Sequence, residues 1–161
     1  MRRREREITD MNEILAILDK SKIIHLGLCD QDQPYVLPMN YGYIYENGTL
    51  TFYLHGAKEG YKYELIRKNP KISFELECDV IPFDGKVACQ YGTSYSSVFG
   101  KGIAEVTDDV DEKIKSLVLL MKTQTGQDFV FNEKLVSIVN VIKVTVTEFT
   151  AKKRPIPGAG I

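Results

Sequence analysis

The chain has 161 residues, enough for one domain with a substantial core, because a folded domain of about this size buries roughly 70% of its unfolded surface. Its 21 lysine and arginine residues nearly balance its 22 aspartate and glutamate residues. This balance gives no general reason to expect a nucleic acid or an anionic membrane as a partner. Any recognition of a phosphate must therefore be local.

The N-terminal segment, MRRREREITD, is charged and lacks the apolar core of a signal peptide. No window of the sequence approaches the ~20 apolar residues that span a bilayer. We therefore expect a soluble, cytoplasmic protein. Cys29, Cys78 and Cys89 are an odd number of cysteines without a C-x-x-C pair, which argues against a disulfide framework and against a structural zinc site.

The first predicted element is a short amphipathic helix over residues 10–20. Asp10 and Glu13 have the spacing of a capping box, and apolar residues then recur at helical intervals. The apolar face of such a helix needs a sheet to cover. A sheet is what the next part of the chain predicts.

Three apolar runs follow, over residues 23–28, 35–45 and 49–54. Asn47 and Gly48 separate the last two runs, and this pair is a strong hairpin signal because both central residues of the turn must tolerate positive φ. We therefore expect three strands, of which the second and third form a hairpin.

The second of these runs contains Pro38, which cannot donate a hydrogen bond to a neighbouring strand and so indicates an edge strand or a bulge. A local break there would leave backbone groups of Met39, Asn40 and Tyr41 free to meet the heteroatom edge of a planar ring. A simple edge strand that contains a proline explains this segment equally well.

The second half of the chain continues the alternation of strands with a few helices. The expected elements are a helix over 61–68 that stops at Asn69-Pro70, a strand over 71–80, a loop over 81–93, a strand over 95–106, a helix over 110–123, a short helix over 133–138, a strand over 141–149 and a Pro/Gly-rich tail over 151–161. Consecutive antiparallel strands with few helices favour a small barrel or a curled sheet, because closure removes exposed edges.

Several catalytic signatures are missing from the sequence. There is no G-x-S-x-G, H-E-x-x-H, Walker lysine loop or G-x-G-x-x-G, and the chain has only two histidines. Enzymes that need a His-rich metal site or a Ser-His-Asp set are therefore not indicated. We interpret His25, in the alternating run IIHLGL, as a packed or hydrogen-bonded strand residue.

The segment LHGAKEGYK carries the chemistry that the sequence does offer. His55 ends a predicted strand and opens a Gly-containing turn, and Lys58 and Lys62 follow it. An imidazole, two ammonium groups and backbone N–H donors around one turn would suit a phosphate-bearing ligand. A capping histidine and two solvated lysines are the alternative. Similarly, Ser96 and Ser97 are either ligand donors or ordinary polar positions on a strand.

These motifs, in this order and spacing, resemble the pyridoxamine 5'-phosphate oxidase-like FMN-binding split barrels, and in particular their nitroimidazole-resistance (Nim-like) branch. The resemblance runs through PYVLPMNYG, YLHGAKEGYK, NPKISFE, YSSVFGKGIAEV and VIKVTVTEFTAKK and covers nearly the whole chain. It implies a mainly β fold, namely a six-stranded antiparallel split barrel of Greek-key type with flanking helices. It also implies a single domain over residues 1–161 that forms a homodimer and holds FMN at the subunit interface.

The resemblance also implies which residues contact the cofactor. These are Pro38, Met39, Asn40 and Tyr41 along the isoalloxazine ring, His55, Gly56, Ala57 and Lys62 at the phosphate end with Lys58 as an addition, and Ser96, Ser97 and Val98 near the flavin. No metal site is expected, and no side chain is assigned as a catalytic residue.

The function that follows is an FMN-dependent oxidoreductase. Its flavin would take electrons from a reduced donor, such as NADH or NADPH, and pass them to a small acceptor, with nitroaromatics among the candidates. The alternatives are an enzyme like pyridoxamine phosphate oxidase, a flavin- or haem-binding sensor or carrier without turnover, and a degenerate relative that binds nothing.

Overall fold

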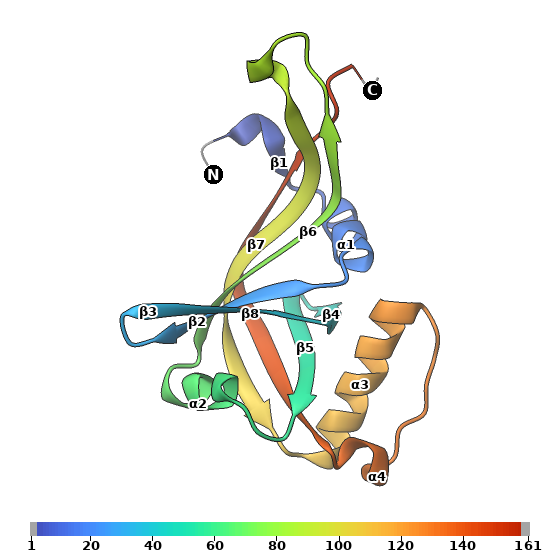
Figure 1. Cartoon of the computed structure of the whole chain (residues 1–161). Helices are drawn as coiled ribbons and strands as arrows, with labels where there is room; N and C mark the ends of the chain where they lie inside the picture. The colour runs from blue at the N-terminus through green and yellow to red at the C-terminus, as the bar shows by residue number, and fades with distance from the viewer. Residues whose placement is uncertain (1–2, 159–161) are drawn as a thin grey trace.

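The structure is a computed structural model that describes residues 3–158. The described part forms one curled antiparallel sheet with helices packed against it (Figure 1). Its strands are β1 (Glu7–Ile8), β2 (Ile24–Asp30), β3 (Gln33–Met39), β4 (Tyr41–Glu46), β5 (Thr49–Ala57), β6 (Lys71–Phe83), β7 (Gly92–Thr107) and β8 (Val139–Arg154). Its helices are α1 (Met11–Lys20), α2 (Tyr61–Lys68), α3 (Val110–Thr125) and α4 (Glu133–Val136), with short 3-10 turns η1 (Arg4–Arg6) and η2 (Ala88–Gln90).

The sheet has the strand order β3-β2-β6-β7-β8-β5-β4, and β1 pairs with β8. Strands β3 and β4 lie at opposite ends of this order, yet Asn40 alone separates them in the chain. The sheet must therefore curl until its two ends meet, although hydrogen bonds do not close it within the described residues. The expected mainly β, antiparallel class is confirmed. The sheet has eight strands rather than six, because the chain breaks the predicted 35–45 strand at Asn40 and adds β1.

Local capping signals fix the ends of the two longer helices, as predicted. The Asp10 carboxylate accepts a hydrogen bond from the Glu13 backbone N–H at 3.0 Å and begins α1. The Asp109 carboxylate accepts one from the Glu112 backbone N–H at 2.8 Å and begins α3. Gly126, with φ of 73°, ends α3 in the left-handed region that favours glycine. None of the helices in the described range is long and apolar enough to cross a membrane.

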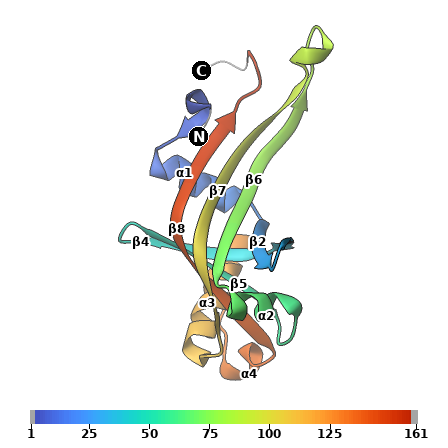
Figure 2. The ribbon, with the colours of Figure 1, turned by 90° about the vertical axis from the view of Figure 1, so that its left-hand side faces the viewer.

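Strands β6, β7 and β8 run side by side as a long ribbon that extends past the crossing strands (Figures 1 and 2). Two predictions fail along this ribbon. The predicted loop over 81–93 shrinks because β6 resumes pairing with β7 at Ile81, after an irregularity at Asp79 with φ of 55°. The first residues of the predicted tail belong to β8, because Arg154 still pairs with Tyr95. Backbone pairing continues here beyond the apolar alternation that sequence patterns detect.

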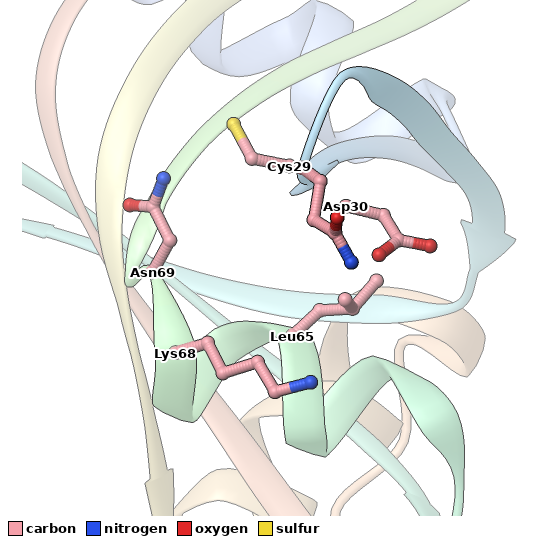
Figure 3. A pocket seen from close by; sticks show the side chains of 6 residues that line it. Cys29, Asp30, Leu65, Lys68 and Asn69 are labelled. Carbon is pink, nitrogen blue, oxygen red and sulfur yellow. The ribbon is translucent and has the colours of Figure 1, made fainter.

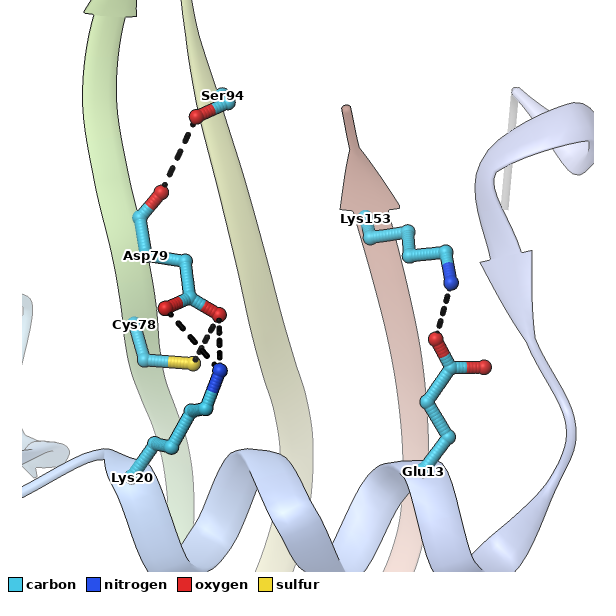
Figure 4. Close-up of polar contacts among 6 residues, drawn as sticks. All are labelled: Glu13, Lys20, Cys78, Asp79, Ser94 and Lys153. Atoms are coloured by element: carbon cyan, nitrogen blue, oxygen red, sulfur yellow. Dashed lines mark hydrogen bonds and ion pairs between the residues drawn. The ribbon is translucent and has the colours of Figure 1, made fainter. Parts of the chain in front are cut away.

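Helix α1 is tied to this ribbon by polar contacts (Figure 4). The Lys20 ammonium lies 3.0 Å from a carboxylate oxygen of Asp79, and the ammonium of Lys153 on β8 pairs with Glu13. The Ser94 hydroxyl donates to the Asp79 carbonyl at 3.2 Å and so helps to hold the irregular segment of β6. The helix thereby covers the sheet that its apolar face was expected to need.

The core lies inside the curl of the sheet and contains a chain of aromatic contacts. The rings of Tyr41 and Phe52 meet edge to face with centroids 5.4 Å apart, and Phe52 meets Phe74 at 5.0 Å. On the opposite side of β4, a β-carbon at Gly42 would lie 2.3 Å from the Leu120 backbone nitrogen. Helix α3 therefore packs directly on the backbone at the start of β4, which fixes the position of the β3–β4 break.

Candidate functional site

The end of β5 offers an open backbone edge. Residues 55–57 pair with β8 on one side, whereas β4 pairs with β5 only as far as Leu54, opposite Tyr41. Successive residues of a strand point their N–H and C=O groups to alternate sides, so part of this backbone faces away from β8. The Asn140 side-chain amide donates to the Lys58 carbonyl at 2.7 Å and holds the chain where it leaves the strand.

Helix α2 places two consecutive side chains against this edge. A β-carbon on Gly56 would lie 3.1 Å from the Lys62 Nζ and 2.7 Å from the Tyr63 hydroxyl oxygen. The Lys62 Nζ also lies 4.5 Å from the centroid of the Tyr63 ring and would be 3.3 Å from a β-carbon on Gly60. We call Gly56, Gly60, Lys62 and Tyr63 the Gly56 cradle, because an ammonium and a phenol pack closely against two glycines.

The polar atoms of the Gly56 cradle have capacity for a ligand. The Tyr63 hydroxyl is buried and finds no hydrogen-bond partner among residues 3–158. Burial raises the pKa of Tyr63, against the opposing charge of Arg67, so the hydroxyl stays protonated and can donate. No carboxylate of the described part lies within ion-pair distance of Lys62. A phenol donor and an ammonium side by side suit an anionic group.

The two other predicted cations do not join the cradle. His55 and Gly56 are successive residues of a regular strand, so their side chains face opposite sides of the sheet, and His55 lies directly opposite Val141. The His55 Nδ1 is buried without a partner in the part of the chain that the structure describes, and burial lowers the pKa of His55. The Lys58 charge lies near Asp108, whose pKa is lowered first by Lys113 and also by Lys58. Of these three predicted cations, only Lys62 lies in the cradle.

The proline strand lies where an edge strand was expected. Pro38 is exposed on β3 and pairs with His25, and Met39 follows it at the end of the strand. The break at Asn40 is occupied by the chain's own contacts, because the Asn40 amide donates to the Lys22 carbonyl at 3.1 Å. The Tyr41 side chain lies in the core and donates to the Leu18 carbonyl at 2.6 Å. Pro38 and Asn40 are exposed, whereas Met39 is partly buried against the core and Tyr41 is fully buried.

The predicted serine strand is also divided between two faces. Val98 is fully buried in the core inside the sheet. Ser97 is its neighbour along β7 and faces the outer side of the sheet, between Glu77 and Lys152 in register. Ser96 shares the inner side with Val98 and is half buried. Of these three residues, only Ser97 shares the outer face with Pro38 and His25.

Comparison with known proteins agrees with this architecture. A family model described as Pyridoxamine 5'-phosphate oxidase matches residues 10–153. The chain belongs to the pyridoxamine 5'-phosphate oxidase family. A solved structure of a proposed 5-nitroimidazole antibiotic resistance protein from Bacteroides thetaiotaomicron is similar to this family member, with 30% identity and a TM-score of 0.75, over 91% of this chain and 86% of the other.

Two more distant structures share the fold. The flavocytochrome Anf3 from Azotobacter vinelandii is 20% identical with a TM-score of 0.76, over 98% of this chain and 73% of the other. The FAD and haem binding protein from Mycobacterium smegmatis is 14% identical with a TM-score of 0.79, over 96% and 77%. At these identities the likeness concerns the fold alone. A search of curated protein sequences finds no match.

Tyr63 is a residue of this family member that the sequence did not single out. An aromatic residue at helical spacing is usually a core residue, and the ring of Tyr63 is indeed buried. Its approach to Gly56 joins a helix to the end of a preceding strand, and the unpartnered hydroxyl is visible only in three dimensions.

A second group that sequence reasoning missed lies on the outer face of the sheet. The His25 Nδ1 lies 3.7 Å from a carboxylate oxygen of Glu75 and 3.9 Å from one of Glu77. Burial is the main cause that raises the pKa of Glu75 to about 7, and the hydrogen bond and charge of Glu77 add to it, while Lys152 opposes it. The alternation along β6 indicates from sequence alone that Glu75 and Glu77 share one face. The pairing of β2 with β6, which adds His25 to them, joins distant segments and is visible only in the structure.

A pocket of about 440 Å³ lies between the β2–β3 turn and α2 of this family member (Figure 3). Its lining residues are Cys29, Asp30, Gln31, Leu65, Lys68 and Asn69. Beside it, the Tyr61 hydroxyl donates to the Asp30 carboxylate at 2.6 Å. Since none of the lining residues belongs to the Gly56 cradle, the pocket and the cradle are separate features on two sides of the same helix.

Proposed function

We propose that the chain binds FMN with its phosphate end at the Gly56 cradle and acts as an FMN-dependent reductase of a small molecule. The observation that carries this proposal is the buried Tyr63 hydroxyl without a partner, which lies beside the Lys62 ammonium and faces Gly56. An unsatisfied buried donor costs about 1–3 kcal/mol, and a phosphate oxygen that accepts from it would recover this cost.

The donor set fits a phosphate monoester. Lys62 supplies positive charge, Tyr63 supplies a neutral O–H donor, and the open edge of β5 at residues 55–57 supplies backbone groups. Lys62 and Tyr63 pack directly against the backbone of Gly56, where a β-carbon would lie within 3.1 Å of both side chains, so their polar atoms lie beside the open edge of β5. Hydrogen bonds from charged donors to phosphate are among the stronger ones in proteins.

The family and the flavin-binding proteins that share its fold support a flavin as the cofactor. The chain belongs to the pyridoxamine 5'-phosphate oxidase family and resembles a proposed 5-nitroimidazole resistance protein. This resemblance favours a nitroaromatic as the electron acceptor. When bound, FMN supplies electron transfer between a reduced donor, NADH or NADPH, and that acceptor. The chain's own residues hold the phosphate end, and the exposed Pro38 on β3 offers an apolar contact for the ring.

The proposal includes a homodimer. Strand β3 is an edge of the sheet, and the outer face beside it exposes Val36 and Phe99, which are 63% and 48% accessible. A second copy of the chain that covers this face would bury these side chains and enclose a ring that one subunit supports from one side only.

The experiment starts from the purified protein. Its flavin is released by denaturation and identified by chromatography, which separates FMN from FAD. The loaded protein is then mixed anaerobically with NADH or NADPH, and a 5-nitroimidazole is added after the flavin absorbance has bleached. We expect FMN, bleaching by at least one donor, and recovery of the absorbance with the nitro compound. Bound flavin that no donor reduces would make the chain a binding protein instead, and failure to take up FMN would refute the proposal.

A further inference from the structure

Strands β2 and β6 bring one imidazole and two carboxylates together on the outer face of the sheet. His25 and Glu75 are direct cross-strand partners, and Glu77 is the next residue of β6 on the same face. One ligand atom from each of the three residues lies within 4.8 Å of the others. These residues come from two strands that are far apart in the sequence, so the register of the sheet creates the group.

The distances are close to those of a metal site. Ligand nitrogen and oxygen atoms about 2.1 Å from a zinc-like ion in tetrahedral geometry are ~3.4 Å from each other. The His25 Nδ1 lies 3.7 Å from Glu75 and 3.9 Å from Glu77, so small side-chain rotations close the remaining gap. In the single chain the three side chains are each about 40% exposed, so water or a group from a second copy on this face can take the other coordination positions.

The charges around the group also favour a cation. Glu75 and Glu77 are neighbouring carboxylates, and close like charges at partly buried positions repel. The positive groups that face them in the described part are His25, when protonated, and Lys152, whose Nζ lies 5.4 Å from the centroid of the Tyr95 ring. A divalent ion would place two positive charges between the carboxylates, where an imidazolium places one.

We propose that His25, Glu75 and Glu77 bind one divalent transition-metal ion on the outer face of the sheet. One imidazole with two carboxylates suits first-row ions such as Mn²⁺, Fe²⁺, Co²⁺ and Zn²⁺ better than Mg²⁺, which prefers oxygen ligands alone. The proposal differs from the sequence-based expectation of no metal site, and its three residues are not those of the Gly56 cradle.

Cobalt is the probe that tests this site, because its absorption reports the ligands. Protein dialysed against a chelator is titrated with Co²⁺ in a calorimeter, and its difference spectrum is recorded. We expect one Co²⁺ per chain without a thiolate-to-cobalt charge-transfer band. Glu77→Gln and His25→Gln should each weaken binding at least tenfold, since each removes one of three ligands.

Two matched variants serve as controls. Glu148→Gln removes a carboxylate that pairs with Lys101 elsewhere on the sheet, and His55→Gln removes the other histidine of the chain. Both should bind Co²⁺ as the unmodified protein does. The site would be refuted by the absence of stoichiometric binding, by equal losses in all four variants, or by a strong charge-transfer band that assigns the ion to a cysteine.

Discussion

A β-carbon on Gly56 would lie 2.7 Å from the hydroxyl oxygen of Tyr63. Real β-carbons essentially never approach another heavy atom so closely, so helix α2 packs in this position only because residue 56 has no side chain. The same missing side chain leaves the Lys62 ammonium and the Tyr63 hydroxyl facing the open edge of β5. The packing of one helix on the end of one strand thus creates the proposed phosphate site.

Gly56→Ala tests this space directly. The added methyl group would occupy the cradle and push against Tyr63 and Lys62, so we expect FMN affinity to fall at least tenfold in a fluorescence titration. Gly27→Ala is the matched control, because a β-carbon there would meet Ser73 at an ordinary 3.6 Å. Equal FMN affinity in both variants would place the phosphate elsewhere.

Tyr63→Phe separates stability from binding. The variant keeps the buried ring and removes a hydroxyl that has no partner within the described range, so the flavin-free protein should gain about 1 kcal/mol in free energy of unfolding. FMN affinity should fall, because one donor to the phosphate is lost. Urea unfolding and FMN titration measure the two effects. Unchanged stability together with unchanged affinity would show that the hydroxyl is satisfied by solvent.

Lys62→Ala should weaken FMN binding by about 1.5–3 kcal/mol, the scale of a charge-assisted hydrogen bond. Lys58→Ala is the informative comparison, because its charge lies near Asp108 rather than in the cradle. Lys68→Ala, on the side of α2 that lines the separate pocket, controls for net charge. Three similar losses would mean that FMN responds to overall charge and not to a specific lysine.

The burial of His55 predicts how the free energy of unfolding depends on pH. Burial lowers the pKa of His55, so the unfolded chain takes up this proton more readily than the folded protein does. This residue therefore makes the protein less stable as pH falls below about 6.5, the ordinary value for histidine. In urea unfolding at pH 7.5 and 5.5, the unmodified protein should lose more stability than His55→Gln. Parallel losses would show that the imidazole is solvated.

Local chemistry in the sequence was sufficient for much of the fold. The caps at Asp10 and Asp109, the Asn47-Gly48 turn and the proline edge strand all follow from the preferences of one or a few residues. The length of β8 did not follow, because its pairing with β7 continues through Lys152 and Lys153, where no apolar alternation marks a strand.

The candidate site was likewise predicted only in part from the sequence. Lys62 lies beside Gly56, whereas His55 faces the other side of the sheet, so the predicted cations of the turn do not gather at one point. The sequence predicted that the chain turns directly after His55, whereas β5 continues to Ala57 and its alternation separates His55 from Gly56. Tyr63 and the pairing of His25 with Glu75 depend on contacts between distant segments, and a single sequence carries no signal for these.

The most direct test of the central claim compares FMN with riboflavin, which has the same ring without the phosphate. If the Gly56 cradle holds the phosphate end, the unmodified protein should bind FMN at least about 100-fold more tightly than riboflavin, and Lys62→Ala should remove most of that difference. Equal affinity for the two flavins, or a preference for FMN that survives Lys62→Ala and Tyr63→Phe together, would contradict the account.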